Sequence, residues 1–266
     1  MYIGNDLNLR NSKLANAKLT TVGNATIGQG TNFKNSSIYA VKDIMTDNAT
    51  VSGSILTSER NIKISNNSVI DATKFYVKKG NADIVNSKIQ GGSIIKAGVL
   101  NLQNSTMENS TAETSYIANL INSSTIRNSK IIAGDNVKAE NLRAYDSEIL
   151  SNLKISVNNG SELNSVRLYA GSDISIEGSR VLNNSSLAAD RDLLVKNSSV
   201  EGNAVIYAGN LAQIMSSSVR NADVTGNSLT LYNARLTDSS IDLKNNLTVT
   251  QGSELSNVNA INHGEL

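Results

Sequence analysis

Two consecutive stretches of the sequence decide the fold: residues 171–189 are GSDISIEGSRVLNNSSLAA, and residues 190–208 are DRDLLVKNSSVEGNAVIYA. The two stretches are equal in length, and apolar residues stand at the same five places in both. These places hold Ile174, Ile176, Val181, Leu187 and Ala189 in the first stretch, and Leu193, Val195, Val200, Ile206 and Ala208 in the second. A fixed period of this length indicates a repeat architecture.

Each repeat contains three short segments in which apolar and polar residues alternate, for example residues 173–176, 179–181 and 186–189. Alternation with a period of two is typical of strands with one buried face. Because the segments return in the same order, equivalent strands of successive repeats must pair in parallel. The same cadence continues through residues 4–22, 60–78, 152–170, 227–244 and 245–263. The sequence therefore predicts an all-β fold, a right-handed parallel β-helix of about fourteen coils of roughly 19 residues, as one repeat domain over residues 1–266.

Asn and Ser are expected at the corners between strands. Asn-Ser pairs stand one or two residues before an inward aliphatic residue at positions 11, 35, 67, 86, 128 and 197. Asn tolerates the left-handed backbone conformation of a tight corner, and its amide can pair with the Asn one coil away. A second cadence, aliphatic-x-Ala, closes several coils and places Tyr39, Tyr169 and Tyr207 in its middle position. Alternation predicts that these tyrosines point outward.

Composition and charge narrow the function classes. Lys and Arg number 24 and Asp and Glu number 23, without a run of like charge, so we expect no nucleic-acid partner. No apolar stretch approaches the ~20 residues that span a bilayer, so we expect no membrane insertion. With 0 Cys and 1 His the chain lacks the ligands of a zinc site. The GGxGxD cadence of metal-binding glycine repeats is absent as well, so we expect no metal and no cofactor.

The coil pattern resembles a known family. Asp/Asn-Leu-x-Ile, then Ser-x-Val, then Ser-x-Ile-x-Ala-Gly is similar to the central repeats of filamentous haemagglutinin-type exoproteins, the large passengers of bacterial two-partner secretion. This class includes adhesins, haemolysins and contact-dependent growth inhibition effectors. The NPNG- and NPNL-like motifs of the family's secretion domain are absent because the chain has 0 Pro, and no toxin domain follows a VENN-like boundary. The chain also starts inside a coil, since residues 2–4 resemble the close of one unit, which suggests an excised segment of a larger secreted protein with an added Met1.

The resemblance implies a structural and presentational function. It predicts a rod segment of an adhesin-like exoprotein that supports cell-surface contact or toxin delivery. It also implies secretion through an outer-membrane two-partner transporter, a location at the surface of a Gram-negative bacterium, and a receptor on a host or neighbouring cell. The family's repeats share no catalytic or binding residues, so the resemblance transfers no site.

The alternative is a β-helical carbohydrate-active enzyme or a tailspike-type polysaccharide-binding domain, because such proteins place carboxylates on neighbouring coils. The best candidates are Asp173 and Asp192, which stand one repeat apart and are thus equivalent, with Asp190 nearby. Asp before a strand also caps a turn, which is its commoner role. Because the chain has no long insertion and 0 Trp, the sequence predicts that it is not an enzyme and has no catalytic residues.

Three further features carry little weight. The single histidine, His263, has no Ser or Asp at triad spacing, and we expect it on the surface. An ice-binding solenoid would need a Thr-x-Thr ladder, which only residues 248–250 approach. Asn-x-Ser/Thr sequences arise by chance in so Asn-rich a chain, although exoproteins of the resembled class accept hexoses at such sites. Examples are Asn24, Asn35, Asn48, Asn104, Asn109, Asn122, Asn184, Asn197 and Asn246.

Overall fold

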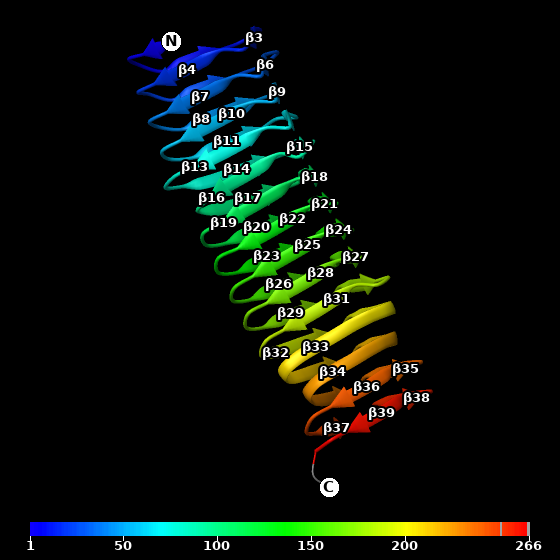
Figure 1. The fold of residues 1–266 in the computed structure, drawn as a ribbon. Coiled ribbons are helices and arrows are strands. Elements are labelled where there is room, and N and C mark those ends of the chain that lie inside the picture. The colour runs from blue at the N-terminus through cyan, green and yellow to red at the C-terminus, as the bar shows by residue number, and fades with distance from the viewer. Residues whose placement is uncertain (251, 265–266) are drawn as a thin grey trace. The chain divides into compact units, whose positions relative to one another are not determined.

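The computed structural model describes residues 1–250 and 252–264. Every regular element in this part of the chain is a β-strand. Among the described residues, no helix has the length and hydrophobicity to cross a membrane. The residue contacts divide the chain into two compact units, Met1–Gly134 (unit 1) and Asp135–Leu266 (unit 2). Within each unit, strands of successive coils lie side by side (Figure 1), and the single repeat domain over residues 1–266 stays a prediction.

Unit 1 contains three parallel sheets, to which each coil contributes one strand. Sheet A comprises β2 (Leu7–Leu9), β5 (Ala25–Ile27), β8 (Ile44–Asp47), β11 (Ile62–Ser65), β14 (Asn81–Val85), β17 (Val99–Gln103) and β20 (Ala118–Ile121). Sheet B comprises β3 (Lys13–Ala15), β6 (Asn32–Lys34), β9 (Thr50–Ser52), β12 (Val69–Asp71), β15 (Lys88–Gln90), β18 (Thr106–Glu108) and β21 (Thr125–Arg127). Sheet C comprises β1 (Tyr2–Ile3), β4 (Lys18–Thr21), β7 (Ser37–Ala40), β10 (Ile55–Ser58), β13 (Lys74–Val77), β16 (Ile94–Ala97), β19 (Thr111–Thr114) and β22 (Lys130–Ala133).

Unit 2 has the same three sheets. Sheet A comprises β23 (Val137–Glu140), β26 (Ile155–Asn158), β29 (Ile174–Glu177), β32 (Asp192–Lys196) and β37 (Leu247–Val249). Sheet B comprises β24 (Arg143–Tyr145), β27 (Glu162–Asn164), β30 (Arg180–Leu182), β35 (Arg235–Thr237) and β38 (Glu254–Ser256). Sheet C comprises β25 (Glu148–Ser151), β28 (Arg167–Ala170), β31 (Ser186–Ala189), β36 (Ser240–Leu243) and β39 (Asn259–Asn262). Two long strands, β33 (Ser199–Met215) and β34 (Ser218–Tyr232), run from sheet B through sheet C into sheet A.

The strand register confirms the predicted parallel β-helix of about fourteen coils. Ile155 pairs with Ile174, and Ile174 pairs with Leu193, so each strand meets its equivalent one coil further on. Along sheet C of unit 1, Lys74 pairs with Ile94 and Ile94 pairs with Thr111, so the first of these two coils is longer than the second by three positions. The corners absorb such differences, and the strands keep their register.

The predicted inward positions form the core. The ten residues predicted to point inward in the two quoted repeats, from Ile174 to Ala208, are at most 1% exposed. Each inward aliphatic side chain packs on its equivalents above and below, because the strands of successive coils pair residue by residue and length differences fall between the strands. Burial of such a column, at about 25 cal/mol per Å² of apolar surface, stabilises the stack together with the continuous backbone ladder.

Asn is the principal corner residue, as predicted. Among the described residues, 26 non-glycine positions have a positive φ, and 20 of them are Asn, including Asn104 and Asn197. Asn enters this left-handed region at lower cost than residues with bulky or β-branched side chains. The predicted amide ladders also occur, since Asn104 Nδ2 donates to Asn86 Oδ1 at 2.7 Å and Asn221 Nδ2 donates to Asn203 Oδ1 at 2.7 Å.

The Ser that follows a corner Asn has a role of its own. The Ser198 hydroxyl donates to the carbonyl of Lys196 at 2.7 Å, and its Oγ accepts the backbone amide of Ser179, one coil earlier, at 3.1 Å. The amide of Ser198 donates in turn to Ser217 Oγ at 3.1 Å. These buried hydroxyls satisfy corner amides that no strand pairs. We call this arrangement the hydroxyl ladder; it explains why Ser follows Asn so often.

Candidate functional site

The outward face of sheet C in unit 2 presents two exposed tyrosines in register. Tyr169 pairs with Ala188, and Ala188 pairs with Tyr207, so the two tyrosines stand two coils apart with a small residue between them. Their exposed fractions are 37% and 41%. At ~4.8 Å per coil the two positions are about 9.5 Å apart along the stack. We call Tyr169, Ala188 and Tyr207 the tyrosine ladder of unit 2; its outward orientation was predicted.

Unit 1 carries the same arrangement on the outward face of its own sheet C. Thr57 pairs with Tyr39 on one side and with Tyr76 on the other. The same register continues from Tyr39 through Thr20 to Tyr2, which is 71% exposed. We call Tyr39, Thr57 and Tyr76 the tyrosine ladder of unit 1. Tyr76 was not predicted, because its coil closes with Val77 where the others have Ala. Its position between inward Phe75 and Val77 was the signal that could have found it.

A carboxylate from the following coil holds the first tyrosine of each ladder. The hydroxyl of Tyr39 donates to Glu59 Oε1 at 2.5 Å, and that of Tyr169 donates to Asp190 Oδ2 at 2.8 Å. These hydrogen bonds raise the pKa of both phenols, because ionisation would place two negative charges together. Both rings are thus neutral donors with a fixed orientation. The tyrosine and its carboxylate are 20 residues apart in unit 1 and 21 residues apart in unit 2. A search of the sequence at one fixed spacing therefore does not find both pairs.

A lysine completes the cluster at the tyrosine ladder of unit 1. Lys78 Nζ lies 2.5 Å from Glu59 Oε1 and 5.3 Å from the centroid of the Tyr39 ring. The hydrogen bond from Lys78, followed by that from Tyr39, lowers the pKa of the Glu59 carboxyl, and the bond to Glu59 raises the pKa of Lys78. The Lys78 ammonium over the ring adds a cation–π contact.

The predicted carboxylates lie at the corner between sheets C and A of unit 2. Asp173 and Asp192 occupy equivalent positions, because the next residues, Ile174 and Leu193, pair. Asp192 Oδ1 accepts Asn210 Nδ2 at 2.7 Å, and Asp173 Oδ1 lies 3.5 Å from Arg191 Nε. Asp190 holds Tyr169. Asp190 and Asp192 thus accept hydrogen bonds, whereas Asp173 Oδ1 is buried without a hydrogen-bond partner and has only this longer ion pair. Among the described residues, no group of three or more His, Asp or Glu side chains is placed to hold a metal.

The other sequence candidates lie elsewhere. His263 is on the surface as expected, 63% exposed, with Nε2 at 3.1 Å from Asp242 Oδ1. Thr248 pairs with Thr230, but the coil before has Gln213 at that place, so no long threonine ladder forms. Most of the named Asn-x-Ser/Thr asparagines are exposed corner residues with positive φ: Asn35, Asn48, Asn104, Asn109, Asn122, Asn184 and Asn197.

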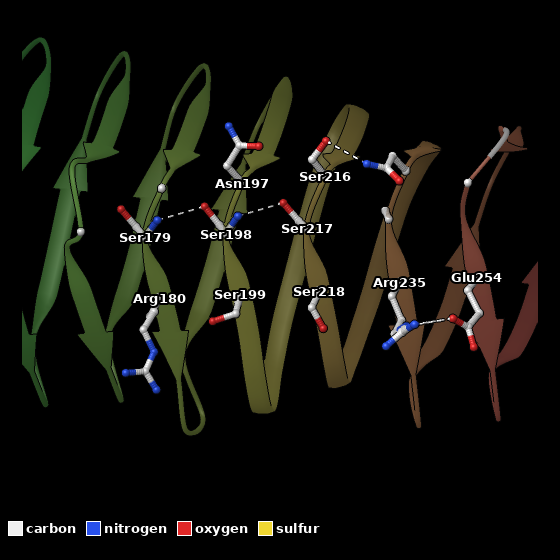
Figure 2. Close-up of a pocket in the computed structure, with 15 residues that line it drawn as sticks. Ser179, Arg180, Asn197, Ser198, Ser199, Ser216, Ser217, Ser218, Arg235 and Glu254 are labelled. Carbon is white, nitrogen blue, oxygen red and sulfur yellow. Dashed lines mark hydrogen bonds and ion pairs between the residues drawn. The ribbon is translucent and has the colours of Figure 1, made fainter.

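A groove of about 800 Å³ follows the corner between sheets A and B of unit 2. Figure 2 shows that the hydroxyls of Ser198 and Ser217 are used by the hydroxyl ladder. Arg235 Nη2 is paired with Glu254 Oε2 at 2.8 Å. The groove offers no aromatic side chain among the residues that line it. The tyrosine ladders therefore remain the stronger candidate for binding.

Fold and site together define a parallel β-helix protein with an aromatic ladder on one sheet of each unit. No protein-family model matches the chain, and no curated protein matches it. Three solved structures are similar. They are the A-modules of the Azotobacter vinelandii mannuronan C-5 epimerases AlgE6 (13% identity, 97% of this chain and 91% of that chain, TM-score 0.42) and AlgE4 (9%, 91% and 90%, 0.33), and the periplasmic alginate epimerase AlgG (8%, 92% and 77%, 0.31).

This finding corrects the prediction that the chain is not an enzyme. All three similar structures are enzymes, so regular coils and 0 Trp were insufficient grounds to exclude catalysis. At these identities and TM-scores, the likeness assigns no activity, substrate or site to this chain.

Proposed function

We propose that the chain is a polysaccharide-binding β-helix whose tyrosine ladders contact an extended glycan. The observation that carries the proposal is the recurrence of one arrangement in both units: two outward tyrosines, two coils apart, with a small residue between them. Each first tyrosine is also held by a carboxylate of the next coil. Core packing does not require this recurrence, because the rings point away from the core.

The chemistry of a tyrosine suits a sugar ring. An exposed phenol ring offers an apolar face to the C–H groups of a pyranose, and it loses little side-chain entropy because it has two χ angles. The spacing of about 9.5 Å is close to the length of two sugar units in an extended chain. The small Ala188 or Thr57 leaves room for the glycan between the rings. Because the strands keep the rings at a fixed separation, little conformational entropy is lost when a glycan binds.

The expected contribution follows from the exposed area. About 40% of a tyrosine side chain of ~200 Å² is ~80 Å², and a sugar stacked on one side covers roughly half of it. At ~25 cal/mol per Å², each ring contributes about 1 kcal/mol. Loss of both rings of the unit 2 ladder then weakens binding about 30-fold. Tyr39 and Tyr76 of unit 1 are less exposed, so their loss weakens binding less.

A second candidate is a structural segment of an adhesin-like exoprotein, which the sequence resemblance suggested. The supporting observation is the regularity of the coils, since equivalent residues of sheet C pair coil after coil and the coil length changes by at most three positions. This candidate includes secretion by a two-partner transporter, a place at the bacterial cell surface and a receptor on another cell. The two candidates are compatible, because a surface segment with tyrosine ladders can contact the glycans of a neighbouring cell.

The test is affinity electrophoresis of the purified chain in gels that contain linear polysaccharides. The double variant Tyr169→Ala/Tyr207→Ala is compared with Tyr232→Ala, which removes a 52% exposed tyrosine from sheet A. We expect the wild type and Tyr232→Ala to bind with the same affinity, and the double variant to bind about 30-fold more weakly. The Tyr39→Ala/Tyr76→Ala variant is tested in parallel. Retardation by no polysaccharide, or equal retardation of all variants, would refute the proposal.

A further inference from the structure

The tyrosine ladder of unit 1 lies beside a row of cationic side chains. Lys42, Arg60 and Lys79 each follow their sheet C strand by two residues, at the corner between sheets C and A. All three are exposed. Because β7, β10 and β13 are neighbours in register, the three cations stand on successive coils, about 4.8 Å apart along the stack. We call them the basic corner.

Acidic partners do not neutralise this face. Glu59 is bound to Lys78 and Tyr39, and Glu113 pairs with Lys96 at 2.7 Å. Asp43 Oδ1 accepts the backbone amide and the side-chain amide of Asn61, both at 3.0 Å. In the part of the chain that the structure describes, Lys42, Arg60 and Lys74 form no ion pair. From β7 to β19, sheet C and its following corner therefore carry six cations (Lys42, Arg60, Lys74, Lys78, Lys79, Lys96) and three carboxylates (Asp43, Glu59, Glu113).

Unit 2 has the same tyrosine arrangement with the opposite charge. From β28 to the sheet C part of β34, sheet C and its following corner carry two cations, Arg167 and Arg191. Four carboxylates stand there: Asp173, Asp190, Asp192 and Asp223. The aromatic spacing is thus shared between the units, and the charge beside it is not. Charge next to a binding surface selects the sign of its ligand and strengthens encounter at low salt.

We infer that the tyrosine ladder of unit 1 and its basic corner form a site for an anionic polysaccharide, one that bears carboxylates along its chain. This inference rests on the proposed function and adds the substrate class to it. The tyrosines stack on sugar rings, and the basic corner faces the carboxylates of successive sugars. Guanidinium and ammonium groups pair with carboxylates by charge-assisted hydrogen bonds, and Arg60 can do so in a bidentate manner.

The test compares polygalacturonate with its carboxyl-reduced, neutral form, using the full chain and Lys42→Gln/Arg60→Gln. The matched control is Lys13→Gln/Lys34→Gln, which removes the same charge from exposed positions of sheet B. We expect the wild type to bind polygalacturonate at least 10-fold more tightly than the neutral form, with affinity that falls as salt rises. Lys42→Gln/Arg60→Gln should lose most of this preference, and the slope of its log K against log salt should be smaller in magnitude by about 1 to 1.5. The control should keep both the preference and the slope of the wild type.

The outcomes separate the inference from the function on which it rests. Equal binding of both polymers at all salt concentrations overturns the anionic class but keeps a polysaccharide-binding chain. Binding of neither polymer, nor of any other polysaccharide, overturns both. Duplex DNA of equal charge serves as a third probe. If it binds as tightly as polygalacturonate, and Tyr39→Ala/Tyr76→Ala changes neither affinity, the face is a general polyanion surface and the inference fails. A preference for dextran sulfate over polygalacturonate would replace carboxylate by sulfate and overturn it as stated.

Discussion

Removal of one buried hydroxyl should test the hydroxyl ladder directly. Ser198 is 8% exposed, and Ser179, whose amide it accepts, is 3% exposed. In Ser198→Ala the amide of Ser179 loses its acceptor, which costs about 1–3 kcal/mol for a buried unsatisfied donor. The bond from Ser198 Oγ to the Lys196 carbonyl, of 2.7 Å, is also lost, and a typical bond of this kind contributes about 1 kcal/mol. We expect a total loss of roughly 2–4 kcal/mol in the free energy of unfolding.

The assay is urea unfolding followed by far-UV circular dichroism. With a slope of about 2 kcal/mol per molar urea, the midpoint of Ser198→Ala should fall by about 1–2 M. Ser199→Ala is the matched control, since Ser199 is the next residue, begins β33 and pairs through its backbone, with an outward side chain. Its midpoint should move by less than about 0.3 M. If the two variants unfold at the same midpoint, the ladder contributes nothing and the role assigned to Ser is wrong.

Two further predictions concern the core and the ion cluster. Replacement of inward Ile176, which is 0% exposed, by Asp should lower the melting temperature strongly, because it removes buried apolar area and buries a charge. Glu177→Lys on the outward side should change the melting temperature little, and equal shifts for the two variants would contradict the register. The pKa of Glu59 is lowered, so its contribution to stability is present above the ordinary pKa of 4.5 and is lost as the pH falls below that value. Glu59→Gln should therefore flatten the acid side of a plot of stability against pH, and an unchanged acid side would contradict the role of the cluster.

The fold was predictable because the period is visible along the chain. Inward positions such as Ile174 and Leu193 recur with alternating polar neighbours, and corner Asn marks where strands end. Both signals are local, since backbone conformation and one-sided burial depend on a residue and its immediate neighbours. Strands and corners were therefore predictable from the sequence, whereas the partner of each corner Ser was not, because it lies in another coil.

The candidate site was less predictable for a physical reason. Outward neighbours belong to different coils, and coil length varies by up to three positions along sheet C of unit 1. Tyr39 reaches Glu59 at 20 residues and Tyr169 reaches Asp190 at 21, so addition of a constant period misses both partners. Tyr76 was missed because Val replaced Ala at the end of its coil. The carboxylates at Asp173 and Asp192 were correctly stacked, but their partners Arg191 and Asn210 were not foreseen.

The architecture itself separates stability from recognition. In each coil the core column, the backbone ladder and the corner hydroxyls fix the fold through inward and main-chain groups, so an outward residue is free to change at little cost. Features that recur on the outward face without a packing reason are therefore the places to look for function. The tyrosine ladders meet this criterion in both units. The basic corner meets this criterion in a different way, because cations lie beside the tyrosine ladder of unit 1 and carboxylates lie beside that of unit 2. This is the pattern expected if two copies of one aromatic surface have been adapted to different stretches or kinds of glycan.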